Sequence, residues 1–417
     1  MNQTENKGGF ILVGGLYPKE IEKDLAINCK NSYLQTAPNE FQHAIIQGFV
    51  SNGIRLHVIT APFLGSYPIK FSKRIVPHYA KESEKITIDS VKYINVLPIK
   101  YLSIEKALKK SLSYWLHKHN ISDTVWVIVY NTIPYYLQSV LSLKKIFPNI
   151  KVGVIITDLL DNAFSFKENK SFLRKIILDI QLKQIKKFYG AIDKYILLTS
   201  QMIEKIPKAS SKSMILEGIW NPSKCSENVD NSNLISEGLN YILYAGTLQQ
   251  FGCVMNLVKA FLSIDDDNIR LIICGSGACE SEIKEISNND SRIILLGRVS
   301  HDLVMYLEKH VQLLINPRLP NGDITRFSFP SKTIEYLVSG TPMLGYHLEG
   351  IPAEYYNYFY TPENYSIEAL TKKIKEIFSL SEEERNEFAR EAESFIMNQK
   401  NPEVQIKRVI NFLRTNE

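Results

Sequence analysis

The most distinctive stretch of the sequence is residues 316–355 (NPRLPNGDITRFSFPSKTIEYLVSGTPMLGYHLEGIPAEY), which brings together several basic side chains and one glutamate of interest. The cations are Arg318, Arg326 and Lys332. A helix is predicted to begin at residues 329–331, because proline suits the first helical positions and Ser331 can cap the free amides. Gly340 is the predicted stop. A helix N-terminus beside cations can bind a pyrophosphate, which Arg grips with paired hydrogen bonds and Lys neutralises as a point charge.

Glu335 lies one turn into this predicted helix. Its carboxylate can accept hydrogen bonds from the vicinal hydroxyls of a ribose. Because the cations balance the phosphate charge, such a site needs no metal ion. The stretch therefore predicts a metal-independent site for a nucleoside diphosphate.

A candidate general base lies in the first half of the chain. Asp158 follows the apolar run VGVIIT at residues 152–157, which is typical of a buried strand. An inverting displacement needs a carboxylate or imidazole within reach of the acceptor hydroxyl. A retaining reaction needs mainly cations that stabilise the leaving phosphate. Asp158 is a predicted base, and a helix-capping or loop carboxylate is the equally weighted alternative.

An α/β fold must position these residues. In the first half, short apolar runs predict strands at residues 10–13, 55–60, 125–130, 152–157 and 195–199, and a helix at residues 40–51. The second half repeats the pattern, with strands at residues 241–245, 270–274, 292–296 and 313–316 and a helix at residues 254–261. Continuous apolar strands separated by helices imply parallel sheets covered on both faces.

The polar stretch 221–240, rich in Ser and Asn, is the predicted linker. It separates an N-terminal domain at residues 1–220 from a C-terminal domain at residues 241–395. A C-terminal helix at residues 396–417 can pack back on the first domain. The predicted fold class is thus α/β, with two Rossmann-like, doubly wound domains that face a central cleft. This architecture fits several functions and does not choose among them.

Composition excludes several classes of protein. The formal net charge of +5 is too small for a dedicated nucleic-acid binder. The five cysteines are scattered, with no pair two residues apart, which favours a reducing compartment over a disulfide framework or zinc site. No secretory leader and no run of about 20 apolar residues is found. We therefore expect a cytoplasmic protein whose membrane contact is peripheral.

Residues 172–195 (FLRKIILDIQLKQIKKFYGAIDKY) place apolar residues at helical spacing with Lys and Arg between them. Such a helix can dock on anionic lipid at the inner membrane surface. A core-packed helix with a solvated basic side is the favoured interpretation.

Three strings in the second half resemble the GT-B glycosyltransferases, particularly the family-4-like group of bacterial polysaccharide enzymes. They are YAGTLQQFG at residues 244–252, LIICGSG with LLGRVSH at residues 271–277 and 295–301, and SFPSKTIEYLVSGTPML at residues 328–344. The resemblance implies that the second domain binds a nucleotide-sugar donor and the first binds the acceptor.

The resemblance also implies roles for individual residues. It implies that Glu335 holds the ribose, and that Gly246 and Thr247 lie near the phosphates. Segments with Gly275, Arg298 and Val299 line the base, and the Gly14-Gly15 turn approaches the donor. The sequence departs from the family at two places. Phe327 stands where many members carry a first glutamate, and Thr247 and Phe251 occupy a turn that often carries Arg and Lys. Arg326 and Lys332 are expected to carry the phosphate charge instead, together with Arg318.

The resulting hypothesis is a metal-independent hexosyltransferase of surface polysaccharide biosynthesis. Its donor is expected to be a UDP-sugar, which is a substrate rather than a cofactor, and its acceptor a glycan or lipid-linked glycan. Arg326 and Lys332 would stabilise the departing diphosphate. The alternative is a non-catalytic GT-B partner or scaffold for an active transferase. A sugar epimerase is disfavoured because the sequence shows no acidic and histidine residues that can be placed around the sugar. A dehydrogenase is disfavoured because no G-x-G-x-x-G turn follows the first strand.

Overall fold

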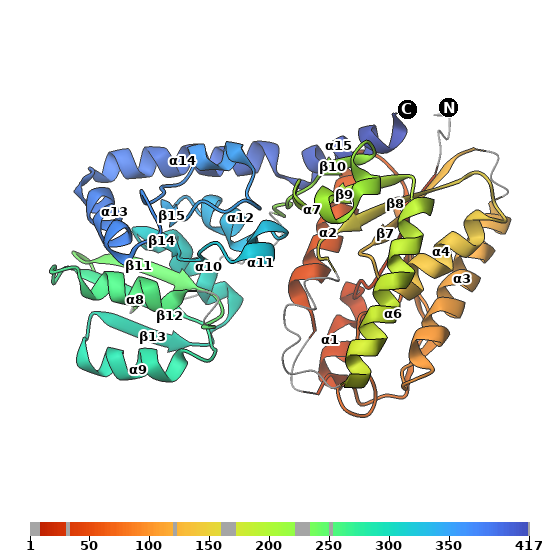
Figure 1. The fold of residues 1–417 in the computed structure, drawn as a ribbon, viewed down its shortest axis with the longest axis horizontal. Coiled ribbons are helices and arrows are strands. Elements are labelled where there is room, and N and C mark those ends of the chain that lie inside the picture. The colour runs from red at the N-terminus through yellow and green to blue at the C-terminus, as the bar shows by residue number, and fades with distance from the viewer. Residues whose placement is uncertain are drawn as a thin grey trace. The chain divides into compact units, whose positions relative to one another are not determined.

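The computed structural model of the chain describes residues 9–30, 34–119, 123–159, 172–221, 234–249 and 253–415. The chain divides into two compact units (Figure 1), which are Met1–Ile219 with Pro402–Glu417, and Trp220–Asn401. Each unit is built on its own mainly parallel sheet with helices between the strands. The predicted α/β class with two Rossmann-like domains is therefore confirmed.

The first unit contains a sheet that has eight strands within the described residues, in the order β10-β9-β8-β7-β1-β2-β5-β4. The strands are β1 (Phe10–Gly14), β2 (Leu56–Thr60), β4 (Tyr79–Glu82), β5 (Ile86–Ser90), β7 (Val125–Tyr130), β8 (Ile150–Ile156), β9 (Lys194–Leu197) and β10 (Ser213–Ile215). Neighbours pair in parallel except β4, which runs antiparallel to β5. A purely parallel sheet was the wrong expectation at this edge, because the mostly exposed β4 lacks the apolar run of a buried strand.

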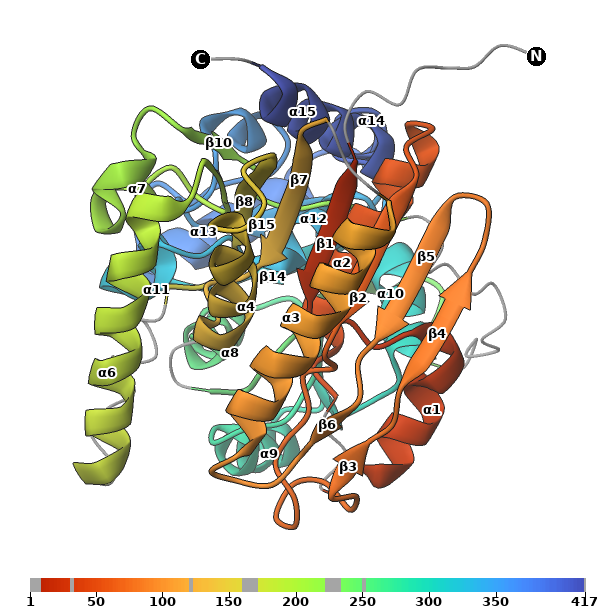
Figure 2. The same ribbon diagram turned by 90° about the vertical axis from the view of Figure 1, so that its right-hand side faces the viewer.

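Two helices far apart in the sequence cover one face of this sheet. These are α2 (Thr36–Ser51) and α15 (Pro402–Arg414), whose Phe49 and Ile406 are buried with Leu12 and Ile128 of the strands. In Figure 2, α3 (Lys100–Lys118) and α4 (Pro134–Lys144) lie in front of the strands. The remaining elements are α1 (Lys19–Asn28), β3 (Ile75–Val76), β6 (Tyr93–Ile94), α6 (Phe172–Phe188), η2 (Tyr189–Ala191), α7 (Met202–Lys205) and η3 (Pro207–Ala209).

The second unit has a parallel sheet in the order β13-β12-β11-β14-β15. Its strands are β11 (Asn240–Ala245), β12 (Ile269–Cys274), β13 (Ile293–Gly297), β14 (Leu313–Asn316) and β15 (Met343–Gly345). Its helices are α8 (Val254–Leu262), α9 (Glu280–Asn289), α10 (His301–His310), α11 (Gly322–Arg326), α12 (Ser331–Leu337), η7 (Ala353–Asn357), α13 (Ile367–Ser379) and α14 (Glu382–Gln399). Every strand predicted in this half is present.

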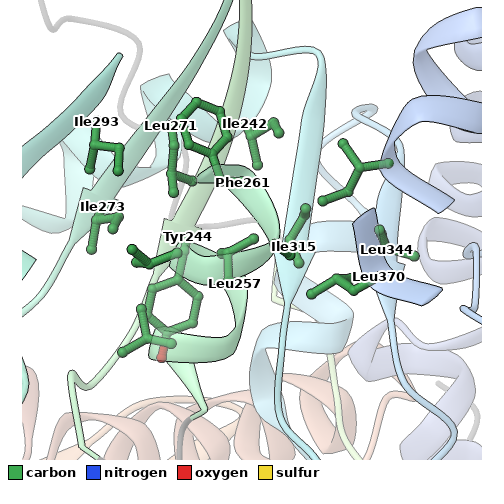
Figure 3. Packing of buried hydrophobic residues seen from close by; sticks show 14 of the residues in the cluster. Ile242, Tyr244, Leu257, Phe261, Leu271, Ile273, Ile293, Ile315, Leu344 and Leu370 are labelled. Atoms are coloured by element: carbon green, nitrogen blue, oxygen red, sulfur yellow. The ribbon is translucent and has the colours of Figure 1, made fainter. Parts of the chain in front are cut away.

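The core of the second unit is formed by one face of the sheet and three helices. Leu257 and Phe261 of α8 pack on Ile242 and Leu271 of the strands (Figure 3), and Leu370 brings in α13. Burying each such side chain contributes about 1.5–3 kcal/mol. On the other face, α10 packs on β11 and α12 packs on β14.

The predicted single helix at residues 396–417 is two helices. Helix α14 ends at Gln399, and α15 begins at Pro402, where proline is favoured as the first helical residue. Only α15 belongs to the first unit. It is fixed there by hydrogen bonds from Gln405 Nε2 to the Gly218 carbonyl (3.0 Å) and from Asn52 Nδ2 to the Glu403 carbonyl (2.8 Å).

Gly48 on α2 allows α15 to approach closely. A Cβ added at Gly48 would overlap the side chain of Ile406 and the carbonyl oxygen of Pro402. Alanine would normally stabilise a helix interior by about 1 kcal/mol relative to glycine. Here the steric cost is expected to win.

We predict that Gly48→Ala lowers the free energy of unfolding by about 1–3 kcal/mol, measured by chemical denaturation. The matched control is Gly190→Ala, because a Cβ added at Gly190 meets nothing within 4 Å. A Gly48→Ala variant as stable as the parent or more stable would contradict this packing.

Candidate functional site

The sheet order of the second unit reverses between β11 and β14. Strands β12 and β13 lie on one side of β11, and β14 and β15 lie on the other. In open α/β sheets, ligands bind outside the carboxyl ends of the strands at such a switch point. The loops that follow β11 and β14 are therefore the candidate site, and they carry Gly246, Thr247 and Arg318.

Main-chain contacts between glycines close the carboxyl ends of β11, β12 and β13. Gly246 N donates to the Cys274 carbonyl (3.0 Å), and Gly275 N donates to the Gly297 carbonyl (2.7 Å). Gly275 has a φ of 143°, and a Cβ added there would overlap the carbonyl oxygen of Gly246. Glycine is thus required at Gly275 by both conformation and space. A ligand at these two glycines would meet backbone.

Lys332 lies between two carboxylates. Its Nζ is 3.1 Å from Glu308 Oε1 and 2.6 Å from Glu335 Oε2. Burial opposes the charged form, but the two carboxylates outweigh it, so the pKa of Lys332 is raised. Burial raises the pKa of Glu308 to about 7 against the pull of Lys332. The two carboxylates fix the ammonium of Lys332 between α10 and α12.

Tyr336 ties α12 to the end of β11. It is fully buried, and its hydroxyl accepts from Ala245 N (2.9 Å) and donates to the Ala245 carbonyl (3.3 Å). The ammonium of Lys332 lies 5.7 Å from the centre of the Tyr336 ring. The predicted pair Lys332 and Glu335 is thus held at the switch point by a residue that the sequence did not single out.

The predicted cap of this helix is not formed. Pro330 is the N-cap, Ser331 is the first helical residue, and no side chain caps the helix. The helix ends at Leu337, three residues before Gly340, whose φ is 77°. The expectation that Ser331 caps the helix was wrong. The N-cap position is taken by Pro330, so Ser331 is already inside the helix and its side chain is exposed.

Arg318 is the cation best placed to meet an anion. It is half-buried, and its Nη2 donates to Ser328 Oγ at 3.3 Å. Among the described residues it has no carboxylate partner, and burial lowers its pKa. Arg318 and Lys332 both act electrostatically on Tyr244, whose pKa burial raises to about 12. The two cations act against burial, because positive charge favours the ionised phenol.

Arg326 is engaged elsewhere. Its Nε donates to Glu349 Oε2 at 2.9 Å, and its guanidinium lies 5.7 Å from the centre of the Phe327 ring. Phe327, which stands where the resembled family often has a glutamate, is 1% exposed and belongs to the core. The substitution therefore has a packing role in this chain.

The other predicted donor residues lie around the same edge of the sheet. Thr247 is exposed, and its carbonyl accepts from Tyr244 Oη at 2.9 Å. Arg298 is exposed and contacts Ser276 Oγ at 3.2 Å, while Val299 is half-buried. They lie beyond the ends of strands β11 and β13.

In the first unit, the Gly14-Gly15 turn is buried at the end of β1. Gly15 N donates to Gln42 Oε1 at 3.2 Å. A Cβ added at Gly14 would overlap Gln42, and one added at Gly15 would lie 2.9 Å from Tyr136 Oη. Internal packing is thus sufficient to require both glycines.

Asp158 follows β8 and keeps an exposed side chain. Thr157 Oγ1 donates to its Oδ2 at 3.4 Å, and Asn131 Nδ2 donates to Thr157 Oγ1 at 2.9 Å. Desolvation of the carboxyl by the surrounding protein raises the pKa of Asp158. Among the residues described, no group of three or more His, Cys, Asp or Glu side chains is arranged to hold a metal.

The sequence interpretation missed Glu308, which is 4% exposed. Its helix reads as an ordinary amphipathic helix, in which a glutamate next to Leu307 gives no sign of burial. Its burial is fixed by contact with Lys332 of a later helix, which the local pattern of α10 does not contain.

Residues 226–395 match the family model described as glycosyl transferases group 1. No curated protein matches this sequence. Similar solved structures include sucrose-phosphate synthase from Thermosynechococcus elongatus, with 13% identity, a TM-score of 0.65 and coverage of 97% of this chain and 98% of that one.

Two further structures match over nearly their whole length. WaaG, a glycosyltransferase involved in lipopolysaccharide biosynthesis, has 16% identity, a TM-score of 0.55 and coverage of 98% of this chain and 100% of its own. The trehalose-6-phosphate protein from E. coli bound with UDP-2-fluoro glucose has 11% identity, a TM-score of 0.66 and the same coverage. At these identities the structures show the fold alone.

These findings confirm the resemblance seen in the sequence: residues 226–395 match the glycosyl transferases group 1 model, and the chain has the GT-B fold. Family and fold together support sugar transfer as the activity.

The buried carboxyl of Glu308 predicts a pH dependence of stability. Because its pKa is raised from 4.5 to about 7, the folded protein holds a proton that the unfolded chain releases. This contribution is fully present below the unfolded pKa and is lost as pH rises through about 7. We expect Glu308→Gln to flatten the decline in unfolding free energy between pH 4.5 and about 7. The exposed Glu349→Gln is the control, and equal slopes in parent and Glu308→Gln would contradict the assignment.

Proposed function

We propose that this protein transfers a hexose from a nucleoside-diphosphate sugar to a hydroxyl of a glycan or lipid-linked glycan in surface polysaccharide biosynthesis. The observation that carries the proposal is the Lys332–Glu335 pair, fixed at the switch point of a sheet whose residues match the group 1 model, together with half-buried Arg318 in the loop after β14. Cations and a carboxylate at this edge suit a diphosphate joined to a ribose.

In this proposal Arg318 and Lys332 bind the diphosphate, and Glu335 accepts from the ribose hydroxyls. Glu308 and Glu335 fix the ammonium of Lys332 before the donor arrives, so little reorganisation is needed as charge develops on the leaving phosphate. Arg326 can join the phosphates only by leaving Glu349. Gly246, Thr247 and Gly275 are assigned to the phosphates and base, together with Arg298 and Val299.

The acceptor side rests on Asp158 as general base. A raised pKa brings a carboxyl closer to the range in which it exchanges protons efficiently near neutral pH. The base of the donor is proposed to be uracil, and the phosphate charge is proposed to be balanced by protein cations without a metal. One structural neighbour, WaaG, is involved in lipopolysaccharide biosynthesis, which supports a glycan acceptor.

We further propose a cytoplasmic location with peripheral contact at the inner membrane surface. Among the described residues, no helix has the length and apolar character needed to cross a bilayer. A lipid-linked acceptor would make such contact useful.

A second candidate is a non-catalytic partner of an active transferase. It is favoured by the buried Phe327, which replaces a glutamate frequent in the family. Donor binding without turnover would support this candidate, and detectable sugar transfer would exclude it.

The donor site is testable with a panel of nucleoside diphosphates titrated calorimetrically without metal. We expect micromolar binding of one diphosphate, which Lys332→Ala abolishes because it removes the central cation. Lys309→Ala, an exposed lysine on α10, is the matched control and should bind as the parent does. Binding that survives Lys332→Ala would contradict the assigned site.

Glu335→Gln should weaken binding of the same diphosphate by about 1.5–3 kcal/mol, because a charged acceptor for the ribose is lost. The same titration with the 2′,3′-dideoxy ligand separates this contact from effects on Lys332. Parent and variant should bind the dideoxy ligand alike. An equal loss with both ligands would show that Glu335 acts through Lys332 rather than on the ribose.

A further inference from the structure

Exposed apolar side chains gather in one region of the first unit, on residues 67–76 and 93–102. We call this region the apolar patch, formed by Ile69, Ile75, Ile94, Leu97, Ile99, Tyr101 and Leu102. Each is at least 40% exposed, and they are seven of the 16 large exposed hydrophobic residues in the described part of the chain. Single exposed hydrophobics are normal, whereas a contiguous group marks an interaction site.

The two segments lie side by side. Strands β3 and β6 pair antiparallel, with Ile75 opposite Ile94, and Tyr67 forms a bridge with Val96. The second segment then runs into the first turn of α3, which carries Tyr101 and Leu102 (Figure 2). The patch is therefore continuous across two elements.

The backbone beside the patch is held firmly. Five successive carbonyls at residues 61–65 each accept a hydrogen bond from a side chain, in order from Tyr136 Oη (2.8 Å), Tyr93 Oη (2.8 Å), Tyr17 Oη (2.6 Å), Lys100 Nζ (2.5 Å) and Asn95 Nδ2 (2.9 Å). Three of these donors belong to the second segment. Loose packing is thus not the reason that the apolar side chains face outward.

The two segments themselves carry only positive charge. Residues 63–78 and 92–102 include the exposed cations Lys70, Lys73, Arg74 and Lys92 and contain no Asp or Glu. Lys73 pairs with Asp24 of α1 at 3.1 Å, whereas in the described part of the chain Lys70 and Lys92 have no carboxylate partner. Apolar side chains bordered by cations complement a surface that is apolar inside and anionic outside.

We propose that the apolar patch docks on an anionic lipid bilayer, with Ile and Leu side chains entering the interface and the cations meeting the headgroup phosphates. A second copy of the chain would bring like charges together. Protein interfaces are depleted in lysine, which disfavours an acidic protein as partner. Helix α6 offers less, since Ile180 is its one large exposed hydrophobic among the side chains described.

This inference gives the proposed membrane contact a location and does not rest on sugar transfer. Binding to vesicles is measured without donor or acceptor, so a failed transfer assay leaves it standing. A protein with no transferase activity can still show the docking.

The test is flotation of the full chain with vesicles of phosphatidylcholine, alone or mixed with phosphatidylglycerol. We expect the parent protein to bind the mixed vesicles. The double variant Leu97→Glu/Leu102→Glu should bind them more weakly by a factor of about ten or more. Ile146→Glu is the matched control, because Ile146 is 61% exposed on the same unit outside the patch. It should bind as the parent does.

A second variant keeps the apolar side chains and removes charge. Lys70→Gln/Lys92→Gln should weaken binding to the mixed vesicles by about fivefold per charge. Parent protein that ignores both vesicles, or Leu97→Glu/Leu102→Glu that binds undiminished, would overturn the proposal. A dimer in sedimentation that this variant dissociates, with no vesicle binding, would instead assign the patch to a second copy.

Discussion

The candidate donor site depends on the pair of ion pairs that the ammonium of Lys332 makes with two carboxylates. The partners of Lys332 come from α10 and from its own helix α12, which Tyr336 fastens to the end of β11. A partly buried ion whose partner Glu308 is itself buried is tolerable only when its partners are in place. The arrangement therefore links the position of a helix, the end of a strand and the charge of the site in one unit of structure.

The same edge of the sheet shows why glycine recurs there. The close approach of Gly246 and Gly275 leaves no space for a Cβ at Gly275, so at these two residues the loops that follow β11 and β12 present backbone to a ligand. Cations are supplied by the loop after β14 and by α12. Backbone on one side and charge on the other is a suitable division for binding a nucleoside diphosphate.

The sequence predicted most of the fold because buried parallel strands are continuous apolar runs, such as Val125–Tyr130 and Ile269–Cys274. It did not reveal the edge strand Tyr79–Glu82, whose side chains are mostly exposed. In the site it indicated Lys332 as a phosphate-binding cation and Glu335 as a ribose-binding carboxylate, and the structure places both on α12. The burial of Glu308 and the Arg326–Glu349 pair depend on contacts between distant segments, which local patterns do not contain.

The most direct test of the donor site is a crystal structure with a bound nucleoside diphosphate. The account predicts phosphates within hydrogen-bond reach of Arg318 and Lys332, and ribose hydroxyls donating to Glu335. A nucleotide bound elsewhere, with Lys332 still enclosed by Glu308 and Glu335, would contradict it.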